Sequence, residues 1–388
     1  MKVLILAEYY PRADDPVLGV WAHRQAVAAR DAGAEVRVLV LHRPIPSLAA
    51  FRDRDLRAAG AALRQPHQAV LDGIEVSYLR YLSPPRPWSY QSWGAWAAPV
   101  LAPALRRIRR RFRFELIHAH YAVPAADAAR RAAPSAPLVV SVHGHDVQGA
   151  AAGGRNVRAA LSRARLVLAN STGTAERCRA LGAGATRVVH LGTDVPAQRQ
   201  PRPQAPTLVT VAHLAERKRH EDVIAALSLL RGRHPGLRYV VVGDGPARER
   251  LGALARTLVV EDLVAFRGQL PHERAVEAAR SATLFVLPSV DEAFGVAYVE
   301  AMAGGVPAIG CRGEDGPEEI AACGGGIALV PRGDPRTLAK TIDGLLRDPR
   351  RLEGMGREAR ATVEREFTWA ACGQATVGAY RQALGGPD

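Results

Sequence analysis

Short apolar runs that alternate with amphipathic stretches limit most strongly what this chain can fold into. Near the start of the chain, apolar residues 2–8 (KVLILAE) and 35–41 (EVRVLVL) enclose the amphipathic stretch 21–33 (WAHRQAVAARDAG). A strand, a helix and a second strand in this order are typical of a parallel sheet. The pattern continues with apolar runs at 115–118, 138–142, 165–169 and 186–190. Residues 1–195 are therefore predicted to form one doubly wound α/β domain.

The alternation stops at residues 196–206 (PAQRQPRPQAP), which contain four prolines and no apolar period, as linkers do. It then resumes, with helical stretches between apolar runs at 207–213, 238–245, 264–268, 283–289 and 306–310. We therefore expect a second doubly wound domain over residues 207–368. After Asp334 the pattern predicts three helices, and we expect the last one, within residues 369–388, to pack back on the first domain.

Composition excludes several other classes of protein. No apolar run approaches the eighteen residues of a membrane-spanning helix, and the first residues are typical of a strand rather than a signal peptide. The four cysteines are scattered without a C-x-x-C pair, which argues against a disulfide framework and a thiolate zinc site. We expect a cytoplasmic protein, with a peripheral position on the inner face of the membrane as an alternative.

The net positive charge is confined to the first half of the chain. Residues 1–200 hold 28 Lys and Arg against 14 Asp and Glu, whereas residues 201–388 hold 24 against 24. A basic half beside a neutral half indicates two domains that meet different partners. The chain carries no signature of helix-turn-helix, zinc or RNA-binding modules, so a nucleic-acid-binding protein is an alternative that we do not favour.

Residues 86–113 combine aromatic side chains with an arginine-rich stretch (RPWSYQSWGAWAAPVLAPALRRIRRRFR). Aromatic residues beside arginines suit an anionic membrane surface or a lipid-phosphate acceptor. Alternatively, the aromatic side chains fill the core and the arginines form a solvated face. Packing of strands on helices favours the second interpretation, and the first stays open.

Two glutamates eight residues apart are the strongest functional signal, in the segment Ser289–Pro307 (SVDEAFGVAYVEAMAGGVP). Glu292 follows an apolar run, and Glu300 lies two turns into the helix expected from Val296. A carboxylate can accept both ribose hydroxyls, and the backbone N–H groups of Phe294, Gly295 and Val296 open a helix where a diphosphate can dock. The alternative for Glu300 is a solvated helix carboxylate.

The remaining nucleotide-binding signals are weaker. Gly243 and Gly245 have the spacing of a dinucleotide fingerprint, but Arg248 occupies the position of its third glycine. A tight turn between a strand and a helix is the favoured interpretation of these glycines. The sequence contains no Walker A motif.

The Glu292–Glu300 segment resembles the Glu-x7-Glu motif of the retaining glycosyltransferases of glycosyltransferase family 4. Other segments resemble that family in its own order, so that nearly the whole chain is covered: HAHYAVPAA, VSVHGHDV, VVHLGTDV, VGDGPARERL, FRGQLPHE, ALVPRGDPRTLAKTIDGLLRD and EREFTW. The resemblance implies an α/β protein of the GT-B fold, with two facing Rossmann-like doubly wound domains, an interdomain cleft and C-terminal helices. Within the family, the chain is most similar to the teichuronic-acid and exopolysaccharide type.

The resemblance also implies roles for single residues. Glu300 corresponds to the glutamate that binds the ribose, and Glu292 to the glutamate beside the donor sugar. Lys218 corresponds to the lysine that neutralises the donor diphosphate, a role that the growing negative charge of the leaving group requires. His143 corresponds to the histidine that contacts a hydroxyl of the sugar.

Three further positions match the family less closely. Gly19 corresponds to a glycine whose backbone approaches the phosphates, although the family often has two adjacent glycines there. Arg267 lies in the region that frames the nucleotide base. The family has an arginine where this chain has His213, and Arg217 is a candidate to supply the missing cation.

These resemblances predict transfer of a sugar from a nucleotide-diphosphate sugar, with UDP the commonest donor, to an acceptor hydroxyl with retention of configuration. The acceptor is expected to be a sugar, a lipid-linked molecule or a small molecule, in the synthesis of cell-surface polysaccharide, glycolipid or secondary metabolite. No metal and no cofactor other than the donor is implied. A nucleotide-sugar hydrolase or epimerase of the same fold is the alternative enzyme.

Overall fold

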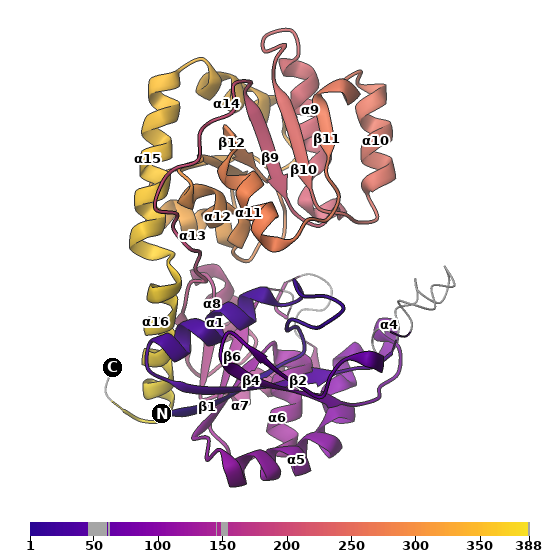
Figure 1. Cartoon of the computed structure of the whole chain (residues 1–388), viewed down its shortest axis with the longest axis vertical. Helices are drawn as coiled ribbons and strands as arrows, with labels where there is room; N and C mark the ends of the chain where they lie inside the picture. The colour runs from indigo at the N-terminus through magenta and orange to yellow at the C-terminus, as the bar shows by residue number, and fades with distance from the viewer. Residues whose placement is uncertain (46–59, 61–62, 145, 149–153, 387–388) are drawn as a thin grey trace. The chain divides into compact units, whose positions relative to one another are not determined.

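The computed structural model describes residues 1–45, 60, 63–144, 146–148 and 154–386. The chain divides into two compact units (Figure 1): the first comprises Met1–Leu191 and Trp369–Asp388, and the second comprises Gly192–Thr368. The division falls after Leu191, whereas the sequence placed it after residue 195. The reason is that residues 192–206 pack on the second unit, where Thr193 N donates to Phe367 O at 2.8 Å and Arg199 Nη2 donates to Gly305 O at 3.0 Å.

The described part of the first unit contains an eight-stranded sheet in the order β3-β4-β2-β1-β5-β6-β7-β8. Its strands are β1 (Lys2–Ala7), β2 (Glu35–His42), β3 (Gln68–Leu71), β4 (Ile74–Arg80), β5 (Leu116–His120), β6 (Leu138–Val142), β7 (Leu166–Ala169) and β8 (Thr186–Val188). Neighbouring strands are parallel except β3 and β4, which form an antiparallel hairpin at one edge. From β1 the strand order runs through β2 and β4 to β3 on one side, and it resumes with β5 on the other side of β1. The strand order therefore reverses between β1 and β5.

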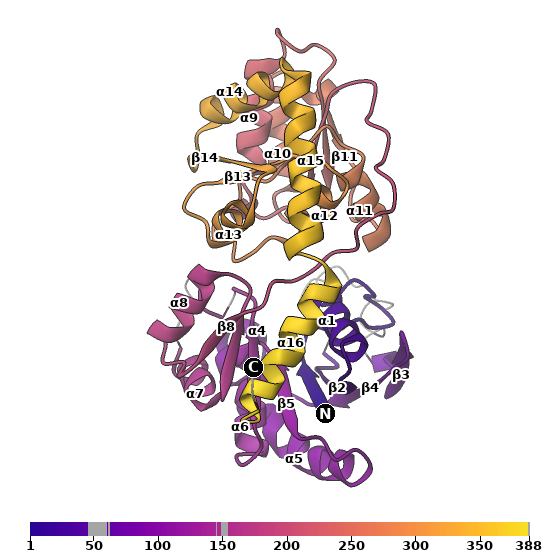
Figure 2. The same ribbon diagram turned by 90° about the vertical axis from the view of Figure 1, so that its left-hand side faces the viewer.

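Helices cover both faces of this sheet. They are α1 (Val20–Asp31), α4 (Arg86–Ser89), α5 (Trp93–Arg111), α6 (Asp127–Ala132), α7 (Arg155–Arg163), α8 (Thr172–Ala180) and α16 (Trp369–Ala383). One apolar cluster joins the sheet to α5, α6 and α7, and a second joins it to α1 and α16. Helix α16 lies along α1 (Figure 2), where the absence of a side chain at Gly373 lets it approach the backbone of Ala28.

The described second unit contains a six-stranded sheet in the order β11-β10-β9-β12-β13-β14, and every strand pair in it is parallel. Its strands are β9 (Thr207–Val211), β10 (Arg238–Val242), β11 (Val264–Phe266), β12 (Leu284–Val286), β13 (Ala308–Cys311) and β14 (Ile327–Val330). Its helices are α9 (His220–Leu230), α10 (Arg248–Thr257), α11 (His272–Arg280), α12 (Val296–Ala303), α13 (Asp315–Cys323), α14 (Pro335–Leu346) and α15 (Pro349–Glu366). The strand order of this sheet reverses between β9 and β12.

The last helices of the second unit begin at the same local signal. Asp334 and Asp348 each precede a proline, and their carboxylates accept backbone N–H groups three residues later at 2.9 Å. An acidic N-cap satisfies a free helical N–H group, and proline in the first turn loses no hydrogen bond there. The sequence analysis missed β3, β4 and β14. Of these, β3 and β14 are edge strands, and exposed or partly exposed positions interrupt the apolar runs of all three. No helix within the described residues is long and apolar enough to cross a membrane.

Candidate functional site

The second sheet brings Lys218 and Glu292 together at the point where its strand order reverses. Lys218 ends a short 3₁₀ turn (Glu216–Lys218) that follows β9, and Glu292 lies in the loop that follows β12. Lys218 Nζ donates to Glu292 Oε2 at 2.5 Å, and both side chains are about nine-tenths buried. In open parallel sheets, ligands bind outside the carboxyl ends of the strands at this reversal. The geometry therefore places a buried ion pair at the edge where a ligand is expected.

Neighbouring loops hold Glu292 in position. Ser289 Oγ donates to Glu292 Oε2 at 2.9 Å, and the backbone N–H of Glu292 donates to Glu314 Oε2 at 2.9 Å. Burial disfavours the ionised form of Glu292, but Lys218, the charge of Arg217 and the Ser289 hydroxyl outweigh burial and hold its pKa below the usual value. Glu292 therefore stays a carboxylate over the physiological range of pH.

Glu314 is a site residue that the sequence analysis missed. It follows β13, the strand next to β12, so its place at the carboxyl edge of the sheet was the available signal. Its side chain is 3% exposed, and Arg332 Nη2 lies 2.6 Å from its Oε1. Through its bond to the backbone of Glu292, Glu314 orients the loop that carries the ion pair.

Glu300 lies on the second turn of α12 and is not a solvated carboxylate, because only 12% of its side chain is exposed. His272 Nε2, in the first turn of α11, lies 3.6 Å from Glu300 Oε1. Burial raises the pKa of Glu300 to about 7, and the charge of Arg280 opposes that rise. A shielded carboxyl on the first turns of a helix can accept two ribose hydroxyls, as the sequence analysis expected.

Gly295 begins α12 in a conformation that favours glycine. Its φ is 81°, and a Cβ atom there would lie 2.5 Å from the ring of Tyr298. The first N–H groups of an α-helix, here from Val296 onward, have no partner within the helix and attract anions. The ring of Phe294 is buried against Phe367, so the part of this residue that can serve a ligand is its backbone, as the prediction named.

The structure distinguishes the two candidate cations near Lys218. Arg217 is exposed, its carbonyl accepts the N–H of Val290 at 2.8 Å, and its charge contributes to the lowered pKa of Glu292. His213, also exposed, lies against the turn of Gly245, whose Cβ would come within 2.8 Å of the imidazole. Arg217 is therefore the cation that acts on the Lys218–Glu292 pair.

Arg267 lies at another part of the same sheet edge. It follows β11, two strands from β9, and its side chain is exposed while its N–H donates to Val241 O at 2.8 Å. Gly243 and Gly245 lie between these regions, in a tight turn after β10 in which Gly243 N donates to Gly268 O at 2.8 Å. The turn leaves Gly243 no room for a side chain, because its Cβ would lie 2.0 Å from Ala212 O.

In the first unit, His143 follows β6 at the carboxyl edge of that sheet. Its Nε2 lies 3.0 Å from Nδ1 of His120, and its ring lies 4.9 Å from the ring of Tyr121. Burial lowers the pKa of His143 to about 4, so the imidazole is neutral at pH 7. A neutral imidazole donates one hydrogen bond and accepts another, which suits a sugar hydroxyl. His120, the last residue of β5, was missed as a partner although the HAHYAVPAA segment contains it.

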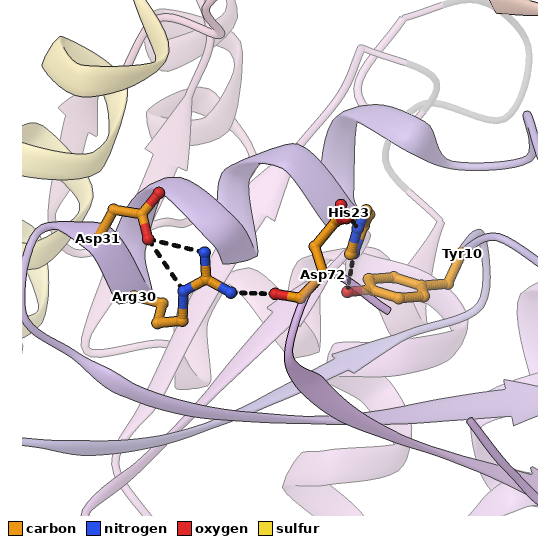
Figure 3. A network of polar contacts seen from close by, with 5 residues as sticks. All are labelled: Tyr10, His23, Arg30, Asp31 and Asp72. Carbon is orange, nitrogen blue, oxygen red and sulfur yellow. Dashed lines mark hydrogen bonds and ion pairs between the residues drawn. The ribbon is translucent and has the colours of Figure 1, made fainter. Parts of the chain in front are cut away.

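Gly19 precedes α1 and has a structural reason to be glycine. Its φ is 63°, and a Cβ atom would lie 2.3 Å from the carbonyl of Tyr9. The start of α1 is also tied to neighbouring loops (Figure 3), since His23 Nδ1 lies 2.7 Å from Tyr10 Oη and His23 Nε2 lies 2.8 Å from Asp72 Oδ2. The backbone of the loop before α1 is therefore held closely against the end of β1.

The aromatic and arginine-rich segment 86–113 separates into a buried and an exposed set. Trp93 is 3% exposed and belongs to the core, whereas Trp88 and Trp96 are 84% and 51% exposed. The arginines at the end of α5 and just beyond it are all exposed, at positions 106, 107, 109, 110, 111 and 113. The core interpretation therefore holds for Trp93 and is wrong for Trp88 and Trp96.

Two family models match the chain, one for each half. Residues 18–196 match the model described as Glycosyltransferase Family 4, and residues 193–362 match the model described as Glycosyl transferases group 1. The second match contains Lys218, Glu292 and Glu300, and the first contains Gly19 and His143.

Curated relatives match over part of their length. The chain is 35% identical to an exopolysaccharide phosphotransferase of Streptomyces coelicolor over 182 residues, which are 46% of this chain and 19% of that protein. It is 32% identical to a glycogen synthase of Mycobacterium tuberculosis over 190 residues, which are 49% of this chain and 46% of that protein. The chain thus matches less than half the length of each of these two relatives.

Solved structures match over the whole chain. Sucrose-phosphate synthase from Thermosynechococcus elongatus has a TM-score of 0.79 at 21% identity, over 99% of this chain and 100% of that chain. HepE from Anabaena, in complex with UDP and glucose, has a TM-score of 0.72 at 20% identity, over 98% and 100%. At these identities the likeness shows the GT-B fold, and the two family models together match residues 18–362, first as Glycosyltransferase Family 4 and then as Glycosyl transferases group 1.

Proposed function

We propose that this protein transfers a sugar from a nucleotide-diphosphate sugar to an acceptor hydroxyl and retains the configuration of the anomeric carbon. The observation that carries the proposal is the buried Lys218–Glu292 pair at the strand reversal of the second sheet, beside the first turn of α12. A cation and free helical N–H groups suit a diphosphate, and a carboxylate next to them suits a sugar that becomes positively charged.

In the proposed reaction the bond between the anomeric carbon and the diphosphate oxygen breaks. The acceptor oxygen forms its bond to that carbon on the same face, and the acceptor proton passes to the departing diphosphate. Lys218 and Arg217 neutralise the negative charge that grows on the diphosphate, and Glu292 stabilises the positive charge that grows on the sugar. Most of the rate enhancement would come from positioning and from these fixed charges.

Other residues take binding roles in this proposal. Glu300 accepts the ribose hydroxyls, Arg267 frames the base, and the backbone at Gly19 approaches the phosphates. His143 contacts a hydroxyl of the donor sugar, which its neutral imidazole can do as donor or acceptor.

UDP is the proposed donor nucleotide, and a cell-surface polysaccharide is the proposed product. UDP is the commonest donor in the family that the chain resembles, and the related fold of the Anabaena protein was solved with UDP and glucose. The teichuronic-acid and exopolysaccharide type is supported by the similarity to the Streptomyces exopolysaccharide phosphotransferase.

A peripheral association of the first unit with anionic membranes is also proposed. The exposed Trp88 and Trp96 and the exposed arginines of α5 combine an interfacial aromatic surface with positive charge. The double variant Trp88→Ala and Trp96→Ala should bind vesicles with anionic lipid about tenfold more weakly in a sedimentation assay. Equal binding to neutral and anionic vesicles, or no loss in the variant, would contradict this part of the proposal.

Calorimetric titration with UDP, GDP, ADP and TDP tests the donor site directly. We expect saturable binding of one nucleotide, weakened about tenfold or more in Glu300→Ala because the ribose contacts are lost. Glu353→Ala is the matched control, since it removes an exposed carboxylate from α15 of the same unit. Incubation with the matching nucleotide sugars and mass spectrometry of the products then separates transfer from hydrolysis or epimerisation. Failure of all four nucleotides to bind the folded protein would refute the proposal.

A further inference from the structure

Three neighbouring parallel strands of the first unit end at polar residues that the proposed reaction does not use. Glu8 follows β1, Arg43 follows β2 and Tyr81 follows β4, and the strands lie in the order β4-β2-β1. The backbone N–H of Tyr81 donates to His42 O, so the ends of β2 and β4 are in contact. These residues share the carboxyl edge of the sheet, close to its reversal between β1 and β5, which is where ligands of such sheets bind.

Glu8 is a buried carboxyl at this edge. Its residue is 7% exposed, and Tyr90 Oη donates to its Oε2 at 3.3 Å. Burial raises the pKa of Glu8 to about 7 in spite of the opposing charges of Arg86 and Arg12. Near neutral pH the carboxyl therefore exists in both forms, and it can donate or accept a hydrogen bond.

Three arginines surround this carboxyl. Arg12 Nη2 donates to the carbonyl of Glu8 at 3.1 Å, and the guanidinium of Arg43 lies 4.7 Å from the ring centroid of Trp93. Arg86 is exposed, with its guanidinium 4.3 Å from the ring centroid of Tyr90. Stacking on aromatic rings fixes the planes of two of these guanidinium groups. Arg43 Nη2 also donates to the carbonyls of Ser83 and Pro84, at 3.2 and 3.3 Å.

The balance of charge at this edge is positive. The charge of Glu8 also acts on the buried carboxyl of Asp146, whose pKa burial raises to about 7 as well. The charges of three guanidinium groups act on Glu8, a carboxyl that is partly protonated at pH 7, and this excess of positive charge therefore favours an anionic ligand.

Buried polar atoms without partners lie in the same place. Within the residues that the structure describes, the hydroxyls of Tyr81 and Ser83 have no hydrogen-bond partner, although these residues are only 3% and 7% exposed. The Nε atoms of Arg12 and Arg43 are also buried without a partner. The charges of Glu8, Arg12 and Arg43 all act on Tyr81, so these groups form one cluster. Buried polar groups are nearly always satisfied, which indicates that a polar molecule belongs here.

We propose that these residues, Glu8, Arg12, Arg43, Tyr81, Arg86 and Tyr90, form the acceptor site, and that the acceptor is an acidic sugar. Its hydroxyl groups bond to the Glu8 carboxyl and the Tyr81 hydroxyl, and its carboxylate or phosphate pairs with the arginines. The inference rests on the proposed function only where it calls the bound sugar an acceptor. The binding chemistry depends on residues of the first unit alone. We call this set of residues the Glu8 cluster.

The test measures binding of small sugars to the full chain without nucleotide. Glucuronic acid and glucose 6-phosphate carry the two candidate anions, a carboxylate and a phosphate. Glucose carries the sugar hydroxyl groups without an anion, and inorganic phosphate carries an anion without the sugar. We expect one acidic sugar to bind at least tenfold more tightly than glucose and than inorganic phosphate in ligand-observed NMR titrations. The acid that binds identifies the anion as carboxylate or phosphate.

Variants assign the binding to the cluster. Glu8→Gln and Arg43→Gln should each weaken binding of that acid about tenfold or more, and Tyr81→Phe, which removes one hydroxyl and little volume, about fivefold. Arg165→Gln is the matched control, because Arg165 is exposed and precedes β7 at the opposite edge of the same sheet. The nucleotide affinity of each variant should equal that of the unmodified protein, which also reports that it is folded.

The outcomes separate this inference from the proposed function. Affinities that are equal for glucose and both acids, or that Glu8→Gln, Arg43→Gln and Tyr81→Phe leave unchanged, overturn the inference even if nucleotides bind. Inorganic phosphate that binds as tightly as the acids makes the cluster a simple anion site and also overturns it. Binding of an acid through the cluster with no binding of any nucleotide supports the acidic-sugar site and refutes the glycosyl transfer.

Discussion

Glu8 and Glu292 lie at the carboxyl edges of two different sheets and differ in charge state. Each lies at the carboxyl edge of a parallel sheet, near the point where the strand order reverses, and each is buried. The pKa of Glu292 is lowered, because an ammonium and a hydroxyl contact its carboxylate directly, whereas the pKa of Glu8 is raised to about 7, because burial outweighs the surrounding arginines. In this pair of carboxyls, direct contact with a cation rather than the number of nearby cations accounts for the opposite pKa shifts.

The difference suits different ligands. The second unit holds a fixed pair of opposite charges, which can answer the charges that separate when a glycosyl–phosphate bond breaks. The first unit holds buried groups that are neutral or partly protonated at pH 7, His143 and Glu8 among them, beside the arginines of the Glu8 cluster. Neutral donors and acceptors bind hydroxyl groups without a large desolvation cost.

Removal of Lys218 should have the largest effect, because it takes away the ammonium group that contacts Glu292. We expect Lys218→Met to lower kcat by about 100- to 1000-fold, through loss of the cation that faces the diphosphate. Lys340→Met is the control, since Lys340 is exposed on α14 of the same unit. Product formation with the donor identified by calorimetry measures the effect, and a loss below tenfold would mean that Arg217 alone neutralises the leaving group.

The same variant should destabilise the protein, because it leaves a buried carboxylate without its partner. Both side chains of the pair are only about one-tenth exposed, so we expect Lys218→Met to lower the free energy of unfolding by about 3 kcal/mol at pH 8. The double variant Lys218→Met and Glu292→Gln should recover most of this loss. Denaturant titration measures the free energy of unfolding of both variants. Equal losses in the single and double variants would show that leaving the Glu292 carboxylate without Lys218 is not what destabilises the protein.

A methyl group at Gly295 should disturb the loop that carries Glu292. Its φ of 81° and the contact with Tyr298 predict that Gly295→Ala lowers the free energy of unfolding by about 2 kcal/mol. Gly344→Ala in α14 is the control: no atom lies within 4 Å of its Cβ position, and alanine favours a helix. A result in which the two variants are equally stable would contradict the strain that we assign to Gly295.

The smallest effect concerns the raised pKa of Glu300. With a pKa of about 7 its carboxyl is mostly protonated at pH 6 and mostly ionised at pH 8, and only the carboxylate accepts both ribose hydroxyls. Nucleotide affinity should therefore rise about tenfold from pH 6 to pH 8 relative to Glu300→Gln, a comparison that cancels the ionisation of the phosphates. The series repeated in His272→Gln removes the imidazole that lies 3.6 Å from this carboxyl. Parallel pH profiles in the unmodified protein and Glu300→Gln would rule out a ribose contact made by the ionised carboxylate.

Local sequence signals were sufficient for part of the candidate site. The spacing of eight residues singled out Glu292 and Glu300, whereas Lys218 was singled out by the resemblance to the family. Glu314, His120 and Glu8 were missed, because each acts through a partner that is distant in the sequence. Glu314 lies 22 residues from the backbone that it holds, and Tyr90 lies 82 residues from Glu8.

The sequence by itself determined the alternation of strands and helices, the start of α12 at Val296 and the two-unit α/β class, because these depend on periodicity and on neighbours along the chain. Only the tertiary structure decided that Lys218 contacts Glu292, since that contact requires β9 and β12 to be adjacent. The tertiary structure also decided which side chains are buried: Trp88 is exposed and Trp93 is buried. The groups packed around Glu8 and Glu292 shift the pKa values of these two carboxyls in opposite directions. A charge responds to everything packed around it, and that packing exists only once distant segments have come together.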